Sequence, residues 1–204
     1  MAGVGTDPVG EVHAYRMQGL EVRTGDLVCT TDGGRTIGPG EFWWLVGKLI
    51  PGDVDHIAVY VGPQGRCVEA GAKGRVVAFE VPGGTWDVAA MLPCRGFEDV
   101  LYGVAYPLAG RGLSHQREVE IRLAAANFCL AHAAKGTPYN LNFLDSDTEQ
   151  AFYCSQLAYR AYLPHGIDLN TDREVPAVPF TRSIVFPQEV WAACRERQRA
   201  HQPS

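Results

Sequence analysis

Short runs of apolar residues, separated by turns rich in glycine and proline, mark the first half of the chain. Runs of roughly four to eight such residues predict buried strands. Five occur, at residues 27–31, 56–61, 67–70, 76–81 and 88–92. The second and third flank Gly62-Pro-Gln-Gly65, so together they predict a β-hairpin. Residues 1–20 hold four glycines and little periodicity, which indicates a loose lead-in.

Helical spacing replaces this pattern in the second half. Ser114 is a favourable N-cap, apolar residues then recur every three or four positions, and Gly136 provides a stop. A second helix is predicted from near Cys154 through Tyr162, and a last short one over residues 188–199. Because strands come first and helices later, the order predicts an α+β fold with an antiparallel sheet packed against helices.

Residues 41–50 predict a short helix or a lid that carries the adjacent Trp43 and Trp44. Two interpretations of this pair stay open. The rings could form an apolar wall of a substrate site, or they could pack beneath a loop, as exposed-looking aromatic residues often do.

Length, composition and charge narrow the class of protein. The 204 residues suit one domain with a core of about 24–195, and 46% hydrophobic content is ordinary for a globular protein. A net charge of -5 with scattered basic residues argues against a nucleic-acid partner. No apolar run approaches the roughly 20 residues of a membrane helix. The first 25 residues lack the pattern of an export signal, so we expect a cytoplasmic protein.

Six cysteines are widely spaced, and no Cys-x-x-Cys pair occurs. In a chain of this length the pattern favours buried free thiols over a disulfide framework. No two cysteines or histidines show the spacing of zinc ligands. We therefore expect no metal and no other cofactor.

Cys154 is the candidate nucleophile. It follows a loop and opens the amphipathic stretch Cys-Ser-Gln-Leu-Ala-Tyr-Arg-Ala-Tyr, so it is expected at a helix N-terminus. The positive end of the helix dipole favours a thiolate there, and the free N–H groups could hold an oxyanion. The alternative is that Cys154 is a small buried apolar residue like other cysteines.

His56 is the candidate base and Glu69 the candidate orienting acid. Alone, His56 would be a structural residue or a solvated strand end, and Glu69 could face water. A carboxylate bonded to one imidazole nitrogen would fix the tautomer and leave the other nitrogen for the thiol. Asp53 and Asp55 are fallback orienting acids, although a residue adjacent to His56 points to the other side of a strand.

The register of the hairpin decides whether His56 and Glu69 can meet. A turn centred on residues 62–63 places them directly opposite each other. A turn centred on residues 64–65 pairs Glu69 with Tyr60, roughly 13 Å along the strand from His56. Both registers keep the two side chains on one face, and we favour the first because it permits a hydrogen bond.

These blocks resemble the NlpC-type papain-like cysteine hydrolases. Gly136-Thr-Pro-Tyr139 with Phe152-Tyr-Cys154-Ser-Gln-Leu157 is similar to their nucleophile block. Gly25-Asp-Leu-Val, His56-Ile-Ala-Val-Tyr-Val-Gly62 and Val68-Glu69-Ala70 are similar to their histidine block. Here the histidine block comes first, which is the order of the circularly permuted branch. That branch includes the YiiX/YebB-like bacterial proteins and, more distantly, the lecithin:retinol acyltransferase group. The resemblance covers about residues 24–165.

The resemblance implies Cys154 as nucleophile, His56 as general base and Glu69 as third residue. It also implies that Tyr139 lines the site and assists the oxyanion hole, with an ordinary buried tyrosine as the alternative. Tyr153 is placed with it among the oxyanion or substrate-lining residues, although ordinary NlpC proteins carry Asp there. Gln156 stands where YiiX-like proteins often carry Glu, and the Asn-Cys-Glu-His signature of the acyltransferases is absent.

The expected activity is hydrolysis of an amide or ester through an acyl-thioester on Cys154. A peptide, a cell-wall-type peptide, and a fatty-acyl amide or lipid ester all fit as the substrate. Two alternatives stay open: an acyltransferase of the lecithin:retinol type, and an idle binding protein on the same fold. Hydrolysis versus transfer, the substrate and the oligomeric state are not decided by the sequence.

Overall fold

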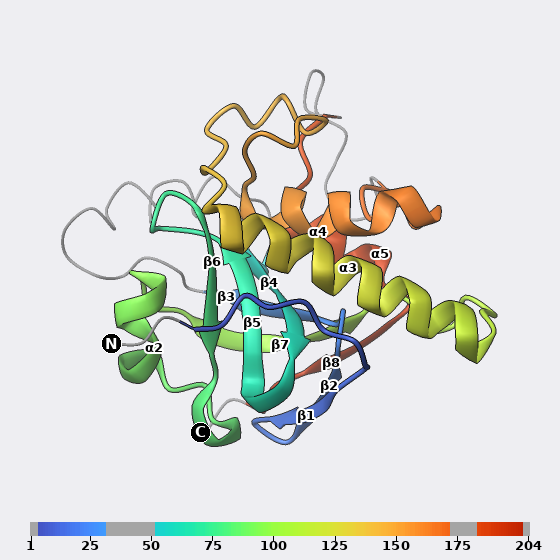
Figure 1. The fold of residues 1–204 in the computed structure, drawn as a ribbon, viewed down its shortest axis with the longest axis horizontal. Coiled ribbons are helices and arrows are strands. Elements are labelled where there is room, and N and C mark those ends of the chain that lie inside the picture. The colour runs from blue at the N-terminus through green and yellow to red at the C-terminus, as the bar shows by residue number, and fades with distance from the viewer. Residues whose placement is uncertain (1–3, 32–51, 172–182, 202–204) are drawn as a thin grey trace.

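The computed structural model of the protein describes residues 4–31, 52–171 and 183–201. Within them the fold is α+β, with a six-stranded antiparallel sheet packed against helices (Figure 1). The sheet runs in the order β6 (Val76–Glu80), β5 (Arg66–Ala70), β4 (His56–Gly62), β3 (Leu27–Thr31), β7 (Val100–Tyr106), β8 (Glu196–Arg199). A separate hairpin joins β1 (Ala14–Met17) to β2 (Leu20–Arg23). The helices are α2 (Val88–Arg95), α3 (His115–Lys135), α4 (Cys154–Tyr162) and α5 (Pro187–Ala193).

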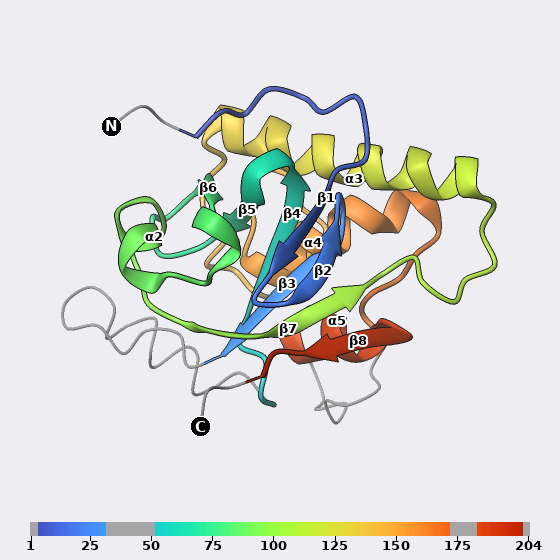
Figure 2. The same cartoon turned by 90° about the horizontal axis from the view of Figure 1, so that it is seen from below.

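Both faces of the sheet are covered. Helices α3 and α4 lie side by side across one face (Figures 1 and 2), and α5 joins the same core. The β1–β2 hairpin and α2 pack on the other face and form a second core. Strand β4 lies between the two cores, and all seven of its residues are buried. This double burial explains why its sequence is a nearly continuous apolar run.

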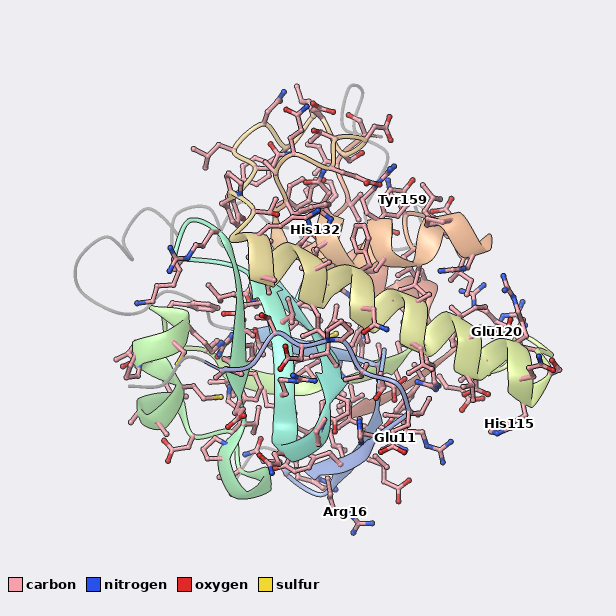
Figure 3. All side chains as sticks on the ribbon, in the orientation of Figure 1. Glu11, Arg16, His115, Glu120, His132 and Tyr159 are labelled. Carbon is pink, nitrogen blue, oxygen red and sulfur yellow. The ribbon has the colours of Figure 1, made fainter. Side chains whose placement is uncertain are left out.

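The two predicted long helices are present with the predicted ends. The Ser114 hydroxyl accepts the N–H of Arg117 at 3.2 Å, and Gly136 ends α3 in the left-handed conformation, with φ of 59°. Helix α4 begins at Cys154 and ends at Tyr162, as expected. Figure 3 shows His115 and Glu120 projecting from the N-terminal half of α3. His132, near the other end of α3, is buried and hydrogen-bonds Thr137 at 2.9 Å.

The predicted strand at residues 88–92 was wrong, because this segment forms helix α2. An apolar run of five residues fits either a strand or a buried helix, so the ends decide. The Asp87 carboxylate accepts the N–H of Ala90 at 3.0 Å, and Gly96 closes the helix with φ of 82°. These two caps provide hydrogen-bond partners for backbone groups that a helix leaves unpaired at its ends, and they favour a helix over a strand here.

The predicted last helix was also too long, since α5 ends at Ala193 and strand β8 follows. Strand β8 is a charged edge strand whose four residues are all exposed, the composition with which proteins protect sheet edges. Its partner β7 was missed, and so was the β1–β2 hairpin in the supposed loose lead-in. Gly103 interrupts the apolar run of β7 because a Cβ there would lie 2.2 Å from the carbonyl oxygen of Gln198 in β8.

Within the described ranges, no helix combines the length and apolar character that crossing a membrane requires. Trp43 and Trp44 lie outside the described residues, so both interpretations of that pair stay predictions.

Candidate active site

Cys154 is the first residue of α4, and the segments before it hold it there. The N–H of Asn140 donates to the carbonyl of Phe152 at 3.0 Å, and the N–H of Phe152 donates to the carbonyl of Pro138 at 3.0 Å. These bonds join the Gly-Thr-Pro-Tyr block to the residues just ahead of the thiol. The first N–H groups of a helix have no partner within it, so they are donors beside the Cys154 sulfur.

Gln156 fixes the start of α4. Its side chain is fully buried, and its Oε1 accepts the N–H of Tyr153 at 3.2 Å and the Nδ2 of Asn140 at 3.0 Å. Its Nε2 donates to the carbonyls of Thr148 at 3.1 Å and Asp145 at 3.3 Å. A glutamate could accept the first two bonds but could not donate the last two while ionised. The amide therefore suits this position, a role that the sequence did not reveal.

The register of β4 and β5 differs from both predicted registers. Val59 pairs with Val68, and Tyr60 pairs with Cys67. Continuing this register places Glu69 opposite Ala58, diagonal to His56 rather than directly across from it. The favoured register was wrong because residues Pro63–Gly65 form a 3-10 turn and the ladder shifts after Tyr60. Diagonal neighbours on one face lie about 7–8 Å apart, within reach of long side chains.

The predicted contact between His56 and Glu69 is confirmed despite the register. The Nε2 of His56 lies 2.9 Å from the Oε2 of Glu69. Cys154 couples electrostatically to the His56 side chain, and Nδ1 is the ring nitrogen that Glu69 does not contact. The ring is held on one side by Phe97, whose centroid lies 4.9 Å away in an edge contact. The structure therefore brings Cys154, His56 and Glu69 together at one site.

The charges of Cys154 and Glu69 favour the protonated form of the His56 imidazole. Burial disfavours the cation and lowers the pKa of His56, but Cys154 and then Glu69 raise it more, to about 10. His56 is therefore an imidazolium at neutral pH. A cationic imidazole beside a cysteine is an arrangement that enzymes use to activate a thiol nucleophile.

Glu69 is held by a buried cation that the sequence did not reveal. The Nε and Nη2 atoms of Arg95 donate to the Glu69 carboxylate at 2.8 to 3.1 Å, and its Nη1 and Nη2 donate to Asp99 at 2.6 and 2.7 Å. Burial alone would raise the pKa of Glu69, but Arg95 and His56 outweigh it and the pKa is lowered. In the sequence, Arg95 follows the apolar run 88–92 and precedes a glycine, and nothing there marks it as buried.

The two candidate tyrosines, Tyr139 and Tyr153, lie at the site but differ in burial and in their contacts. Tyr139 is half-buried, and burial together with Cys154 and Tyr153 raises its pKa well above the usual value, so its hydroxyl keeps its proton. Tyr153 is buried, and its hydroxyl accepts the N–H of Val185 at 2.9 Å. Both rings make edge contacts with Phe143. Tyr153 thus anchors the start of α4, whereas Tyr139 is coupled electrostatically to Cys154.

The fallback acid Asp53 is engaged elsewhere, with the hydroxyl of Tyr102 at 3.1 Å and with Arg199.

A polar cavity of about 370 Å³ lies away from the thiol. Its lining includes Glu21, Arg23, Asp26, Tyr106, Glu118 and Arg122, and it contains neither Cys154 nor His56 nor Glu69. Asp26 and Arg122 form a buried ion pair at 2.7 Å there. This cavity is separate from the candidate site.

All six cysteines are free thiols, and Cys94 is the exposed one. Among the described residues, no group of three or more His, Cys, Asp or Glu side chains is arranged to hold a metal ion.

No protein-family model matches the chain, and searches among curated proteins and solved structures give no match either.

Proposed function

We propose that the protein is a papain-like thiol hydrolase of the permuted NlpC type, which cleaves an amide or ester bond through an acyl-thioester on Cys154. One observation carries the proposal: a cysteine at a helix N-terminus couples electrostatically to an imidazole that is hydrogen-bonded to a buried carboxylate. This arrangement of nucleophile, base and orienting acid is recognised by geometry and roles, whatever the order in the chain.

The chemistry follows from the charges at the site. The Cys154 thiolate attacks the carbonyl carbon, and the N–H groups at the start of α4 stabilise the oxyanion, with Tyr139 as a further donor. The His56 imidazolium gives its proton to the leaving amine or alkoxide as the bond to carbon breaks. Water then attacks the thioester while the neutral His56 takes a proton from it, and the acid product leaves as the thiolate is restored.

The substrate stays within the expected classes: a peptide amide, a cell-wall-type peptide, or a fatty-acyl amide or ester. The exposed Leu141 and Leu144 flank Phe143, which contacts Tyr139 and Tyr153. Apolar surface beside the nucleophile supports a substrate with an apolar portion near the scissile bond.

The test is selective alkylation of the thiols with limiting iodoacetamide from pH 5 to 9, read by peptide mass spectrometry. Cys94 serves as an internal reference because it is exposed and takes no part in the site. We expect Cys154 to react at least about tenfold faster than Cys94 at pH 6, because only a thiolate is an efficient nucleophile. His56→Ala should remove this advantage, whereas the matched control His165→Ala should keep it.

Activity on p-nitrophenyl esters and aminoacyl p-nitroanilides completes the test. A Cys154 acyl adduct that decays in water, and that Cys154→Ser does not form, supports the hydrolase. Decay only after an amine or alcohol is added would favour an acyltransferase instead. A Cys154 that reacts no faster than Cys94 would overturn the proposal.

A further inference from the structure

Arg95 is the most deeply buried cation near the site. Its side chain is 1% exposed, and its guanidinium lies 4.4 to 4.8 Å from the ring centroids of Phe79, Trp86 and Phe97. Placing a charge among three aromatic rings is costly unless partners compensate. Here the partners are two carboxylates, and one of them is the acid that contacts His56. The cost of burying Arg95 is thus tied to the catalytic machinery.

The diagonal placement of Glu69 relative to His56 shows how Arg95 affects the orientation of the Glu69 carboxylate. Because Glu69 lies opposite Ala58, its carboxylate must lean along the strand to reach His56. Arg95 holds both carboxylate oxygens, with Nε at 3.1 and 3.0 Å from Oε1 and Oε2. A Cβ at Gly71 would make only ordinary contacts with Oε1 at 3.5 Å and the His56 ring at 3.6 Å, but it would crowd Phe97 at 3.2 Å.

We propose that Arg95 is a positioning residue that holds the Glu69 carboxylate in place and in its charged form beside His56. The inference rests on the proposed function, because it concerns the residue that orients the base. A carboxylate with no exposed surface would otherwise take up a proton. A neutral Glu69 would no longer stabilise the His56 imidazolium, and Cys154 would then lose its own partner charge.

Asp99 balances the charge of Arg95. It is 2% exposed, accepts two bonds from the guanidinium, and is fixed by the Nε1–H of Trp86 at 3.1 Å. If Arg95 were lost, the negative charge of Asp99 would add to the tendency of Glu69 to take up a proton. If Asp99 were neutral, Arg95 would attract Glu69 more strongly. The two substitutions therefore differ in the direction of their effect on His56.

The experiment measures the pH profile of Cys154 alkylation in four variants of the full chain. Arg95→Met and Glu69→Gln should shift the profile to higher pH by about one unit or more, which lowers the rate at pH 6 by about tenfold or more. Arg95→Lys keeps the charge but loses the planar fork, so it should keep the wild-type midpoint with a lower rate. Asp99→Asn should leave the midpoint at or below that of the wild type.

A double variant separates coupling from general damage. Arg95→Met combined with Glu69→Gln leaves no unpaired carboxylate at position 69, and we expect no further shift beyond that of Glu69→Gln alone. The matched control is Arg122→Met, which removes another buried arginine whose ion pair with Asp26 lies in the separate cavity. Near-ultraviolet circular dichroism and thermal unfolding verify that each variant is folded. If Arg95→Met is not folded, Arg95→Lys takes its place: a lower rate at the wild-type midpoint supports the role of Arg95, and a wild-type rate refutes it.

The outcomes are distinct for the two proposals. If wild-type Cys154 is not activated, the proposed function fails. If Glu69→Gln shifts the profile but Arg95→Met leaves it unchanged, or if Arg122→Met shifts it equally, only the role of Arg95 is refuted. Equal shifts in Arg95→Met, Glu69→Gln and the double variant, with the midpoint restored in Arg95→Lys, support that role.

Discussion

Replacing Cys154 with alanine should lower the pKa of His56. The imidazole is buried, and burial by itself lowers its pKa, so the raised value depends on Cys154 and, after it, on Glu69. The gap between the ordinary 6.5 and about 10 corresponds to about 5 kcal/mol in favour of the imidazolium. At pH 8 this makes about 99% of His56 cationic, against about 3% for an unperturbed histidine.

Nuclear magnetic resonance of histidines labelled with ¹³C and ¹⁵N measures this titration directly. The chain has six histidines, and His56→Gln identifies the resonance of interest. In Cys154→Ala we expect the pKa of His56 to fall well below that of the wild type, because burial then opposes Glu69 alone. Cys94→Ala, which changes an exposed thiol, should leave it unchanged. A wild-type His56 that titrates near 6.5, or one that Cys154→Ala does not affect, would refute the imidazolium assignment.

Two further predictions concern the scaffold. Gly103→Ala should lower the free energy of unfolding by about 1–3 kcal/mol, because its Cβ would overlap the Gln198 carbonyl of β8. Urea unfolding checks this, with Gly10→Ala as a control because nothing lies within 4 Å of that Cβ; equal stabilities would contradict it. Gln156→Glu should cost about 1–3 kcal/mol by losing two amide donations to loop carbonyls. Gln150→Glu, at an exposed position, should be neutral in the same assay. A neutral Gln156→Glu would show that the two amide donations do not stabilise the fold.

The three residues of the proposed site could be predicted because each depends on a local pattern. A helix start places Cys154, and the period of two along strands keeps His56 and Glu69 on one face. The observed pairing is offset by two residues along one strand from either predicted register. An offset of two residues keeps each side chain on the same face of the sheet. The predicted contact between His56 and Glu69 therefore forms although the predicted turn of the hairpin was wrong.

The network behind Glu69 could not be predicted because it depends on tertiary contacts. Residues 88–95 fit a strand or a helix, and the choice rests on caps whose geometry is not visible in the sequence. The burial of Arg95 requires rings that come from three separate segments, at Phe79, Trp86 and Phe97. Likewise, the Glu-Arg-Gln-Arg of β8 pairs as a strand only because β7 offers it an edge.

The order of the segments has a consequence for synthesis of the chain. His56 and Glu69 emerge from the ribosome first, and Cys154 follows about a hundred residues after His56. Strands β3 to β7 and the Arg95–Glu69–Asp99 network are therefore synthesised before the nucleophilic sulfur of Cys154. Contacts of such long sequence separation form slowly. We expect the thiol to meet its base only after α4 has been synthesised, so a nascent chain that ends before Cys154 would carry no activated nucleophile.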